Sequence, residues 1–449
     1  MNAKRIFENQ NISDTKKIEI FKQGKKDIKK YADYYSGKQD ILFRQHPTDP
    51  SKNPKLNKLV FNLAEKIVDL HSNFLFGKKI ELVNNSIDED SFNLFENSWN
   101  NAKLQSHYLN LSKKLYSLSH VAEYIYVKEG KVNHTIFCPT KNELYVNFNE
   151  KDELDLFMRE YSIQEYINGE VITLEYIEVY LPDKLLTYVL NNNQYTLVEE
   201  LSRSYAKMPI VYYSIKEPLY WQHKSLLDRY NMINSVQADV IDTYSYPILM
   251  LMGMLFNFNA NGEDSEGKTL LDYFKSGIPK ILHLDNQDGE KANAEYLQQK
   301  GADESFVNET KNILNSILYL TSTPNISFEN TKGIGNLSGI ALKLMFLDTT
   351  LKSMGLQADF FHLTRSINLH KSALKSLVPS FNADIQIDAV FENPIPKNIK
   401  ETIESIATAY SAEILSQETA ISANPYVSNP SEELIKINSK VENIGASFI

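Results

Sequence analysis

Hydrophobic residues in the C-terminal part of the chain recur with a helical period over an unusually long stretch. Their spacing alternates between four and three residues, which places them on one stripe of an α-helix: Ile340, Leu344, Leu347, Leu351, Met354, Ala358 and Phe361. A helix from Leu337 to Ser376 would be roughly 60 Å long at about 1.5 Å per residue. Gly355 lies inside it, and we expect a kink there because glycine weakens a helix interior.

The N-terminal half changes from helical to strand-like patterns near residue 120. Helical periodicity covers 13–35, 57–75 and 92–118. Seven segments with strand character follow, and an Asn-rich turn at 191–193 separates the last two: 121–127, 131–137, 144–148, 154–163, 173–181, 185–190 and 195–198. These strands do not alternate with helices, so we expect them to pair antiparallel.

Two helical patterns flank an inserted lobe in the centre of the chain. The first covers 223–245 and the second begins at Asp303, while 246–302 is irregular and strand-like. This lobe contains the apolar run 247–258, and about twelve residues are too few to cross a bilayer as a helix. We interpret the run as a buried strand or a surface between subunits. A half-buried strand at 382–391 and helices from 399 onward complete an α+β fold, in which two helices form a stalk with a tip.

A glycine-containing loop joins the second stalk helix to the predicted rod. Its candidate site residues are Asn330, Thr331, Lys332, Gly333, Ile334, Gly335 and Asn336. Gly333 and Gly335 permit backbone conformations that other residues rarely adopt. Lys332 is the only cation between Pro324 and Lys343. It is either an ordinary solvated lysine or a positive charge that each subunit brings close to a polyanion.

No motif in the sequence indicates catalysis, a cofactor or a metal. The glycines at 333, 335 and 339 lack the preceding strand and the spacing of a dinucleotide-binding loop. The chain contains no Gly-x-Ser-x-Gly elbow, phosphate-binding loop or His-Glu-x-x-His pair. Asp384 and Asp388 share a face of the predicted strand, but a solvated strand face explains them better than a metal site. His362 and His370 share a helix side, where ordinary packing accounts for them.

The composition is that of a soluble globular protein with an acidic body. Apolar residues make up 42% of the chain and charged residues 23%. The single Cys138 excludes an intrachain disulfide and suggests a reducing compartment.

The formal net charge is −10, but residues 1–58 carry 14 Lys and Arg against 7 Asp and Glu, so the remainder carries −17. A protein whose remaining residues carry this negative charge does not bind nucleic acid tightly over its whole surface. We interpret the Lys-rich N-terminal arm as a solvated helix face. The N-terminus shows no secretory signal.

Four segments taken in order resemble the portal proteins of tailed bacteriophages, in particular the family of long-tailed phages. The first is Tyr34 to Leu42 with Asn57 to Asn62 and Asp69, and the second is Phe76 to Ile80. The third is Thr323 to Asn325 with Asn336 to Lys343. The fourth is Leu415 to Ala420 with Asn424 to Val427, Glu433 and Leu434. The order and spacing fit from about residue 30 to about residue 440, which is nearly the whole chain.

The resemblance implies a portal fold that assembles as a ring of about twelve subunits. The implied divisions are a wing at 1–222, stem helices at 223–245 and 303–323, and a clip at 246–302. A tunnel loop follows at 324–337, then a long wing helix with a wing strand at 338–395 and a crown at 396–449.

The resemblance also implies a function and its partners. Double-stranded DNA would pass through the channel of a ring at the unique capsid vertex, during packaging and again during ejection. The large terminase and then the head-tail adaptor would dock on the ring. Major capsid and scaffolding proteins are further implied partners, and no membrane is involved. The protein would be assembled in the bacterial cytoplasm and reside in the virion. Two alternatives remain open, namely a non-portal virion scaffolding or interaction protein and an enzyme without a recognisable motif.

Overall fold

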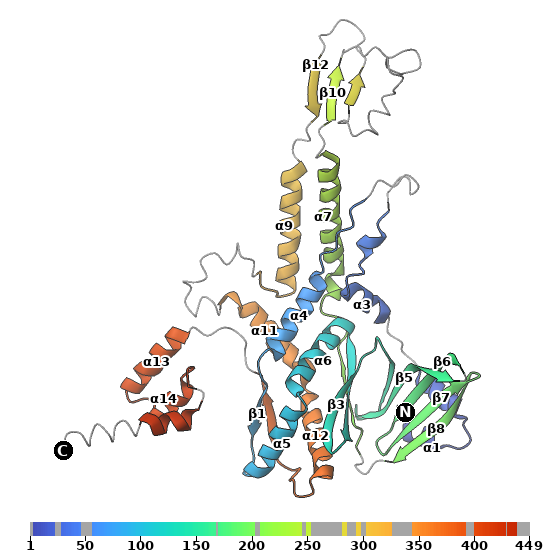
Figure 1. Ribbon diagram of the computed structural model, residues 1–449, viewed down its shortest axis with the longest axis vertical. Helices are drawn as coiled ribbons and strands as arrows, with labels where there is room; N and C mark the ends of the chain where they lie inside the picture. Colours follow the sequence, from blue (N-terminus) through green and yellow to red (C-terminus); the bar gives the residue numbers. More distant parts are fainter. Residues whose placement is uncertain are drawn as a thin grey trace, which may run out of the picture.

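The fold combines α-helices with four β-sheets over the described residues, which confirms the predicted α+β class (Figure 1). The computed structural model describes the following parts of the chain: 3–22, 28–45, 56–167, 169–202, 207–244, 248–252, 281–284, 293–297, 302–325, 344–391, 399–427 and 429–437. Among the helices in these ranges, none is both long and apolar enough to cross a bilayer.

The largest sheet is an antiparallel five-stranded one with the order β4-β5-β6-β7-β8. Its strands run in sequence order: Glu143–Phe148, Leu154–Ile167, Glu170–Tyr180, Lys184–Asn191 and Gln194–Ser202. Each was predicted from its strand pattern, and the structure extends most of them by a few residues. The turn predicted at 191–193 is confirmed, because Asn192 and Asn193 both adopt positive φ angles. Such a pair of left-handed residues is typical of a tight hairpin.

Two short helices, α1 (Ala3–Glu8) and α2 (Asp14–Phe21), pack on one face of this sheet. Phe7 and Phe21 stack with ring centroids 6.0 Å apart. Lys22 follows α2, and its Nζ donates a hydrogen bond of 2.7 Å to Glu160 on β5. The arm is therefore docked on the sheet at Lys22, while Lys16 on α2 and Lys29 and Lys30 on the next helix are exposed, as predicted for a solvated helix face.

The largest hydrophobic core lies between a three-stranded antiparallel sheet and several helices. This sheet has the order β3-β2-β9, with strands at Lys131–Phe137, His120–Lys128 and Ile210–Ser214. The helices that contribute to the core include α3 (Ile28–Tyr35), α4 (Leu63–Phe76), α5 (Glu89–Asn101) and α6 (Leu104–Leu118). Strand β9 was not predicted, because it is a short apolar run without polar alternation.

The two central helices, α7 (Lys224–Tyr244) and α9 (Ala302–Leu320), stand side by side as a stalk (Figure 1). At its far end lies a three-stranded sheet made of β10 (Ile248–Met252), β11 (Ile281–Leu284) and β12 (Asn293–Leu297). Strand β10 pairs parallel with β11 and antiparallel with β12. Residues 248–252 of the apolar run 247–258 thus have the predicted strand conformation, and 247 and 253–258 lie outside the described residues.

The long rod is not one continuous helix, so this part of the prediction is wrong. Helix α11 (Leu347–Gln357) is followed by a 3-10 turn, η5 (Ala358–Phe360), and then by α12 (Leu363–Leu377). Gly355 lies inside α11, three residues before the helical geometry changes. The tighter turn accompanies the burial of Phe360, whose ring lies 4.7 Å from that of Phe76 and 5.5 Å from that of Tyr213. Packing of this aromatic side chain accounts for the turn better than the glycine does.

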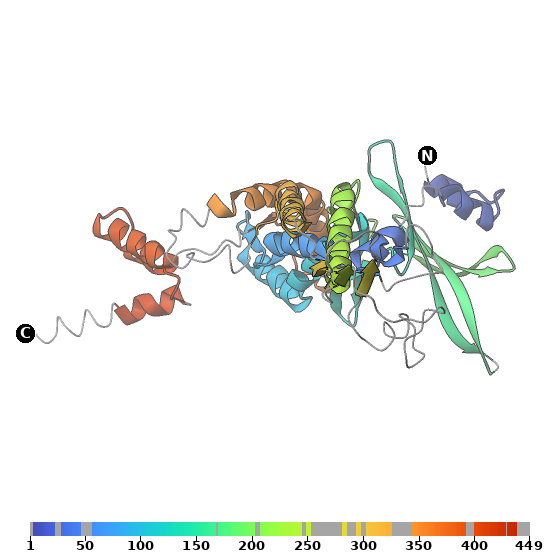
Figure 2. The same ribbon diagram turned by 90° about the horizontal axis from the view of Figure 1, so that it is seen from above.

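A two-stranded antiparallel sheet joins distant parts of the chain, since β1 (Glu81–Asn84) pairs with β13 (Ile387–Val390). The strand predicted at 382–391 is shorter than expected, and Asp384 lies before it. The Asp388 carboxylate accepts a hydrogen bond of 2.7 Å from Asn85. The expected alignment of Asp384 with Asp388 on one strand is therefore absent. Helices α13 (Ile399–Ser411) and α14 (Gln417–Ala423) stand to one side of the other elements (Figure 2).

Candidate functional site

All seven predicted loop residues, 330–336, lie outside the described residues. The structure does describe the chain on both sides of them, up to 325 and again from 344. Both of these flanking parts contact helix α4. The Nε2–H group of His71 donates a hydrogen bond of 2.8 Å to the carbonyl of Thr321, and the Phe74 ring lies 5.9 Å from that of Phe346. Thr321 and Phe346, which precede and follow the predicted site in the sequence, thus both lie next to α4.

The end of α9 is fixed by several polar contacts with its neighbours. The hydroxyl of Thr349 on α11 donates a hydrogen bond of 2.8 Å to the carbonyl of Ser322. Ser322 itself adopts a left-handed backbone conformation with φ of 54°. These contacts pair the carbonyl groups of the two residues that directly follow α9. They also tie α9 to both α4 and α11.

His71 is buried at this junction and carries no charge. Burial lowers the pKa of His71 to about 4, because desolvation disfavours the imidazolium form. Its Nδ1 atom has no hydrogen-bond partner among the described residues. Protonation would therefore place a hydrogen on a buried nitrogen that has no acceptor in the described part of the chain.

An extended segment, residues 56–62, runs along α7 and is held by a polar stripe of that helix. The backbone N–H groups of every second residue in the segment donate to side chains spaced four apart on α7: Phe61 to Asn231 at 2.9 Å, Leu59 to Ser235 at 2.9 Å and Asn57 to Asp239 at 2.7 Å. Side chains four residues apart on a helix are separated by about 6 Å along its axis, and every second residue of an extended chain is separated by about 6.6 Å. The acceptors on α7 are therefore spaced like the N–H groups that they bind. Side chains of α7 thereby take the place of a neighbouring strand.

The base of α7 is tied to the preceding helical layer by a cluster of charged and aromatic groups. Lys224 Nζ contacts the carboxylates of Asp40 at 2.6 Å and of Asp228 at 2.5 Å. The Tyr34 hydroxyl donates a hydrogen bond of 2.9 Å to Asp228. Burial, followed by the nearby Asp228 carboxylate, raises the pKa of Tyr34. The hydroxyl therefore stays protonated and remains a donor.

The apolar stripe that the sequence pattern places on α11 faces solvent in the single chain. Leu347, Leu351 and Met354 are 48–61% exposed. The buried side of α11 is a different set of residues, which includes Thr349, Ser353 and Leu356. At the nearby end of α9, Tyr319 and Leu320 are exposed as well. Exposed apolar side chains of this kind are typical of surfaces that contact another protein.

Comparison with known proteins adds a family and a set of distant structural relatives. The amino-acid sequence matches the family of phage portal proteins described as SPP1 Gp6-like over residues 14–445. No curated protein matches the chain. A chain in the virion of the native gene transfer agent particle has a TM-score of 0.43 at 11% identity, covering 88% of this chain and 92% of that one. A chain in the neck of the empty gene transfer agent particle, computed with C6 symmetry, has a TM-score of 0.43 at 10% identity with the same coverage.

Proposed function

Because the chain belongs to the SPP1 Gp6-like family of phage portal proteins, we propose that it forms the ring at the unique capsid vertex through which double-stranded DNA is packaged and ejected. Proteins of this family are structural components of the virion that form symmetric rings, and they are not enzymes. Family membership therefore sets aside both alternatives that the sequence left open, the enzyme and the non-portal scaffolding protein.

The exposed apolar stripe of α11 is the observation that best supports assembly from many copies. In the single chain it leaves Leu347, Leu351 and Met354 in contact with water. Burial of apolar surface contributes about 25 cal/mol per Å², so a closed ring that covers this stripe gains stability from it. In a closed ring the same contact repeats around the axis, so a stripe that lies in the interface is covered on every subunit.

We assign the parts of the fold to the divisions of a portal subunit as follows. Residues 1–222 form the wing, and 338–395, which contain α11, α12 and β13, complete it. The pair α7 and α9 forms the stem within 223–245 and 303–323. The small sheet at its end belongs to the clip, 246–302. Residues 324–337 form the tunnel loop and 396–449 the crown.

The proposed partners follow from this assignment. About twelve copies form the ring, with DNA in its channel. The large terminase docks on the clip during packaging, and the head-tail adaptor replaces it afterwards. Major capsid and scaffolding proteins contact the ring from the side of the capsid.

The charge of the chain suits a channel through which DNA slides. Duplex DNA carries about one negative charge per 1.7 Å of axis. A body with a net charge of −17 beyond residue 58 does not hold the phosphates tightly. Lys332 then supplies one ring of positive charge at the tunnel loop, where weak contacts with phosphates are made and broken as the DNA moves.

The assembly surface is tested by placing charges on the apolar stripe. The double variant Leu351→Asp with Met354→Asp should remain folded, because both side chains are exposed in the single chain. It should not form rings, because a covered carboxylate without a partner costs several kcal/mol. Native mass spectrometry at several protein concentrations measures the distribution of species.

A matched control is Leu94→Asp, an exposed leucine on α5 away from the stripe. This variant should form rings like the unaltered protein. Rings of unchanged stability in the double variant would show that the stripe is not an interface between subunits.

A further inference from the structure

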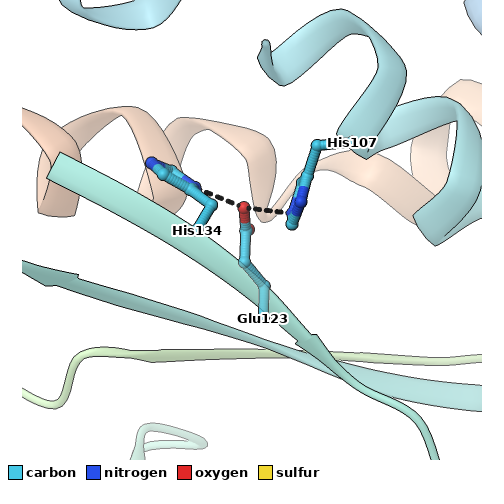
Figure 3. Close-up of side chains that lie close together, drawn as sticks. All are labelled: His107, Glu123 and His134. Carbon is cyan, nitrogen blue, oxygen red and sulfur yellow. Dashed lines mark hydrogen bonds and ion pairs between the residues drawn. The ribbon is translucent and has the colours of Figure 1, made fainter. Parts of the chain in front are cut away.

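A buried cluster of histidine and glutamate side chains lies in the main core, outside the surfaces described above. Glu123 on β2 points between His134 on β3 and His107 on α6 (Figure 3). Its Oε1 atom is 2.7 Å from Nδ1 of His134 and 3.0 Å from Nε2 of His107. The three side chains are 0%, 1% and 10% exposed, in the order Glu123, His134 and His107. Three separate elements thus direct one ligand atom each to a common point.

One of these ligand atoms is left without a hydrogen bond. Nε2 of His107 is close to the carboxylate but not aligned with it, and within the described part of the chain it has no hydrogen-bond partner. A buried polar atom of this kind is destabilising by about 1–3 kcal/mol. Its lone pair can be satisfied by an ion placed between the three side chains.

The carboxylate of Glu123 is fully buried within the cluster. Among the described residues, its only ion-pair partners are His107 and His134. A carboxylate in a core is stabilised by such pairing or by a bound metal, and the same three side chains would hold that metal.

A second layer of hydrogen bonds holds the cluster in place. Nδ1 of His370 on α12 lies 2.9 Å from Nε2 of His134, and Nε2 of His370 lies 2.8 Å from the hydroxyl of Ser98. The Tyr213 hydroxyl donates a hydrogen bond of 3.2 Å to the other carboxylate oxygen of Glu123. Partners of this kind orient the histidine and carboxylate ligands of metal sites.

We propose that His107, Glu123 and His134 bind one zinc ion that fastens α6 to the β2–β3 hairpin. Two imidazoles and one carboxylate are a donor set that suits zinc better than magnesium or calcium, which prefer oxygen. A tetrahedral zinc ion with ligands at about 2.0–2.1 Å separates those ligands by roughly 3.3 Å. The three atoms already lie within 4.8 Å of one another. To admit the ion, the carboxylate oxygen must move back from the two nitrogens, and the two imidazoles must move towards each other, because two ligands at about 2.1 Å from one ion are at most about 4.2 Å apart. A water molecule completes the coordination.

The proposal is tested on the full-length protein after treatment with a chelator. Addition of Zn²⁺ should raise its Tm, and Co²⁺ should give the visible absorption of a four-coordinate site with one ion bound per chain. Glu123→Gln and His107→Ala should weaken binding more than about tenfold, and His370→Ala should weaken it by about 10- to 100-fold through the second layer. His223→Ala, a histidine outside the cluster, is the matched control and should bind like the unaltered protein.

Two results would overturn the proposal. One is the absence of both the Co²⁺ absorption and the Zn²⁺-induced rise in Tm in the unaltered protein, and this measurement needs no variant to fold. The other is binding of equal strength in the unaltered protein, Glu123→Gln and His107→Ala. Either result would leave the cluster as a hydrogen-bonded core network without a metal. Neither depends on ring assembly or on DNA, so the outcome is independent of the proposed portal function.

Discussion

His71 shows how a single side chain makes the stability of this fold depend on pH. Its folded-state pKa of about 4 lies below its ordinary value of 6.5. Between these values the unfolded chain binds more protons than the folded one, so stability falls as the pH is lowered from 6.5 towards 4. Above pH 6.5 the full stabilisation from the neutral His71 is present. Between the two pKa values the free energy of unfolding falls by up to about 1.4 kcal/mol for each pH unit.

We predict that His71→Gln removes this part of the slope. Glutamine can still donate a hydrogen bond to the Thr321 carbonyl but does not titrate. Urea denaturation at pH 7, 6 and 5 should therefore show a smaller loss of stability with decreasing pH in the variant than in the unaltered protein. Parallel pH dependences would mean that His71 is charged or solvated in the folded protein.

The sequence could not reveal the cluster around Glu123. His107, Glu123 and His134 follow no motif with metal-ligand spacing, since they lie on a helix and two strands that meet only in the folded core. His370 was assigned to ordinary packing because its helical position is all that the sequence shows. The pairing of β2 with β3 and the packing of α6 and α12 against them bring these side chains together.

At the scale of elements, the polar stripe of α7 is the contact that fixes the segment 56–62. Asn231 is buried, accepts from the Phe61 N–H group and donates to Gln39. We predict that Asn231→Ala destabilises the fold by about 1–3 kcal/mol, because Gln39 loses a buried hydrogen bond and the Phe61 N–H group a partly buried one. The midpoint of urea denaturation measures the change.

Asn234→Ala is the matched control for this prediction. Asn234 lies on the same helix, where its side-chain amide donates a hydrogen bond to the carbonyl of Tyr230 in the preceding turn. Alanine is the stronger helix former, so this variant should be as stable as the unaltered protein or slightly more stable. Equal midpoints for the two variants would show that the stripe does not hold the segment.

Elements defined by a local pattern were predicted well, and those defined by distant contacts were not. The strands of the five-stranded sheet alternate in polarity and are separated by turn residues, so their existence follows from the sequence. Strand β1 is short, and its partner β13 lies far later in the sequence, so no local pattern predicts the pairing. The periodicity of α11 and α12 is continuous, but the position of Phe360 among Phe76 and Tyr213 decides where the helix is interrupted.

At the scale of the whole molecule, the apolar stripe of α11 is exposed in the single chain, and a ring of subunits would cover it. The stripe from Leu347 to Met354 was recognised as periodic from the sequence, but only the fold shows that it faces outward. The family membership was predicted from four short segments, and the match over residues 14–445 confirms it. The roles of Lys332 and of its neighbours in the loop stay predictions, since these residues lie outside the described part.

The central claim is that copies of this chain close into a ring around a channel. Electron microscopy of the purified full-length protein, at several salt and protein concentrations, tests it most directly. We predict rings of about twelve copies with an open axial channel. Monomers or dimers under every condition, without any ring, would contradict the account.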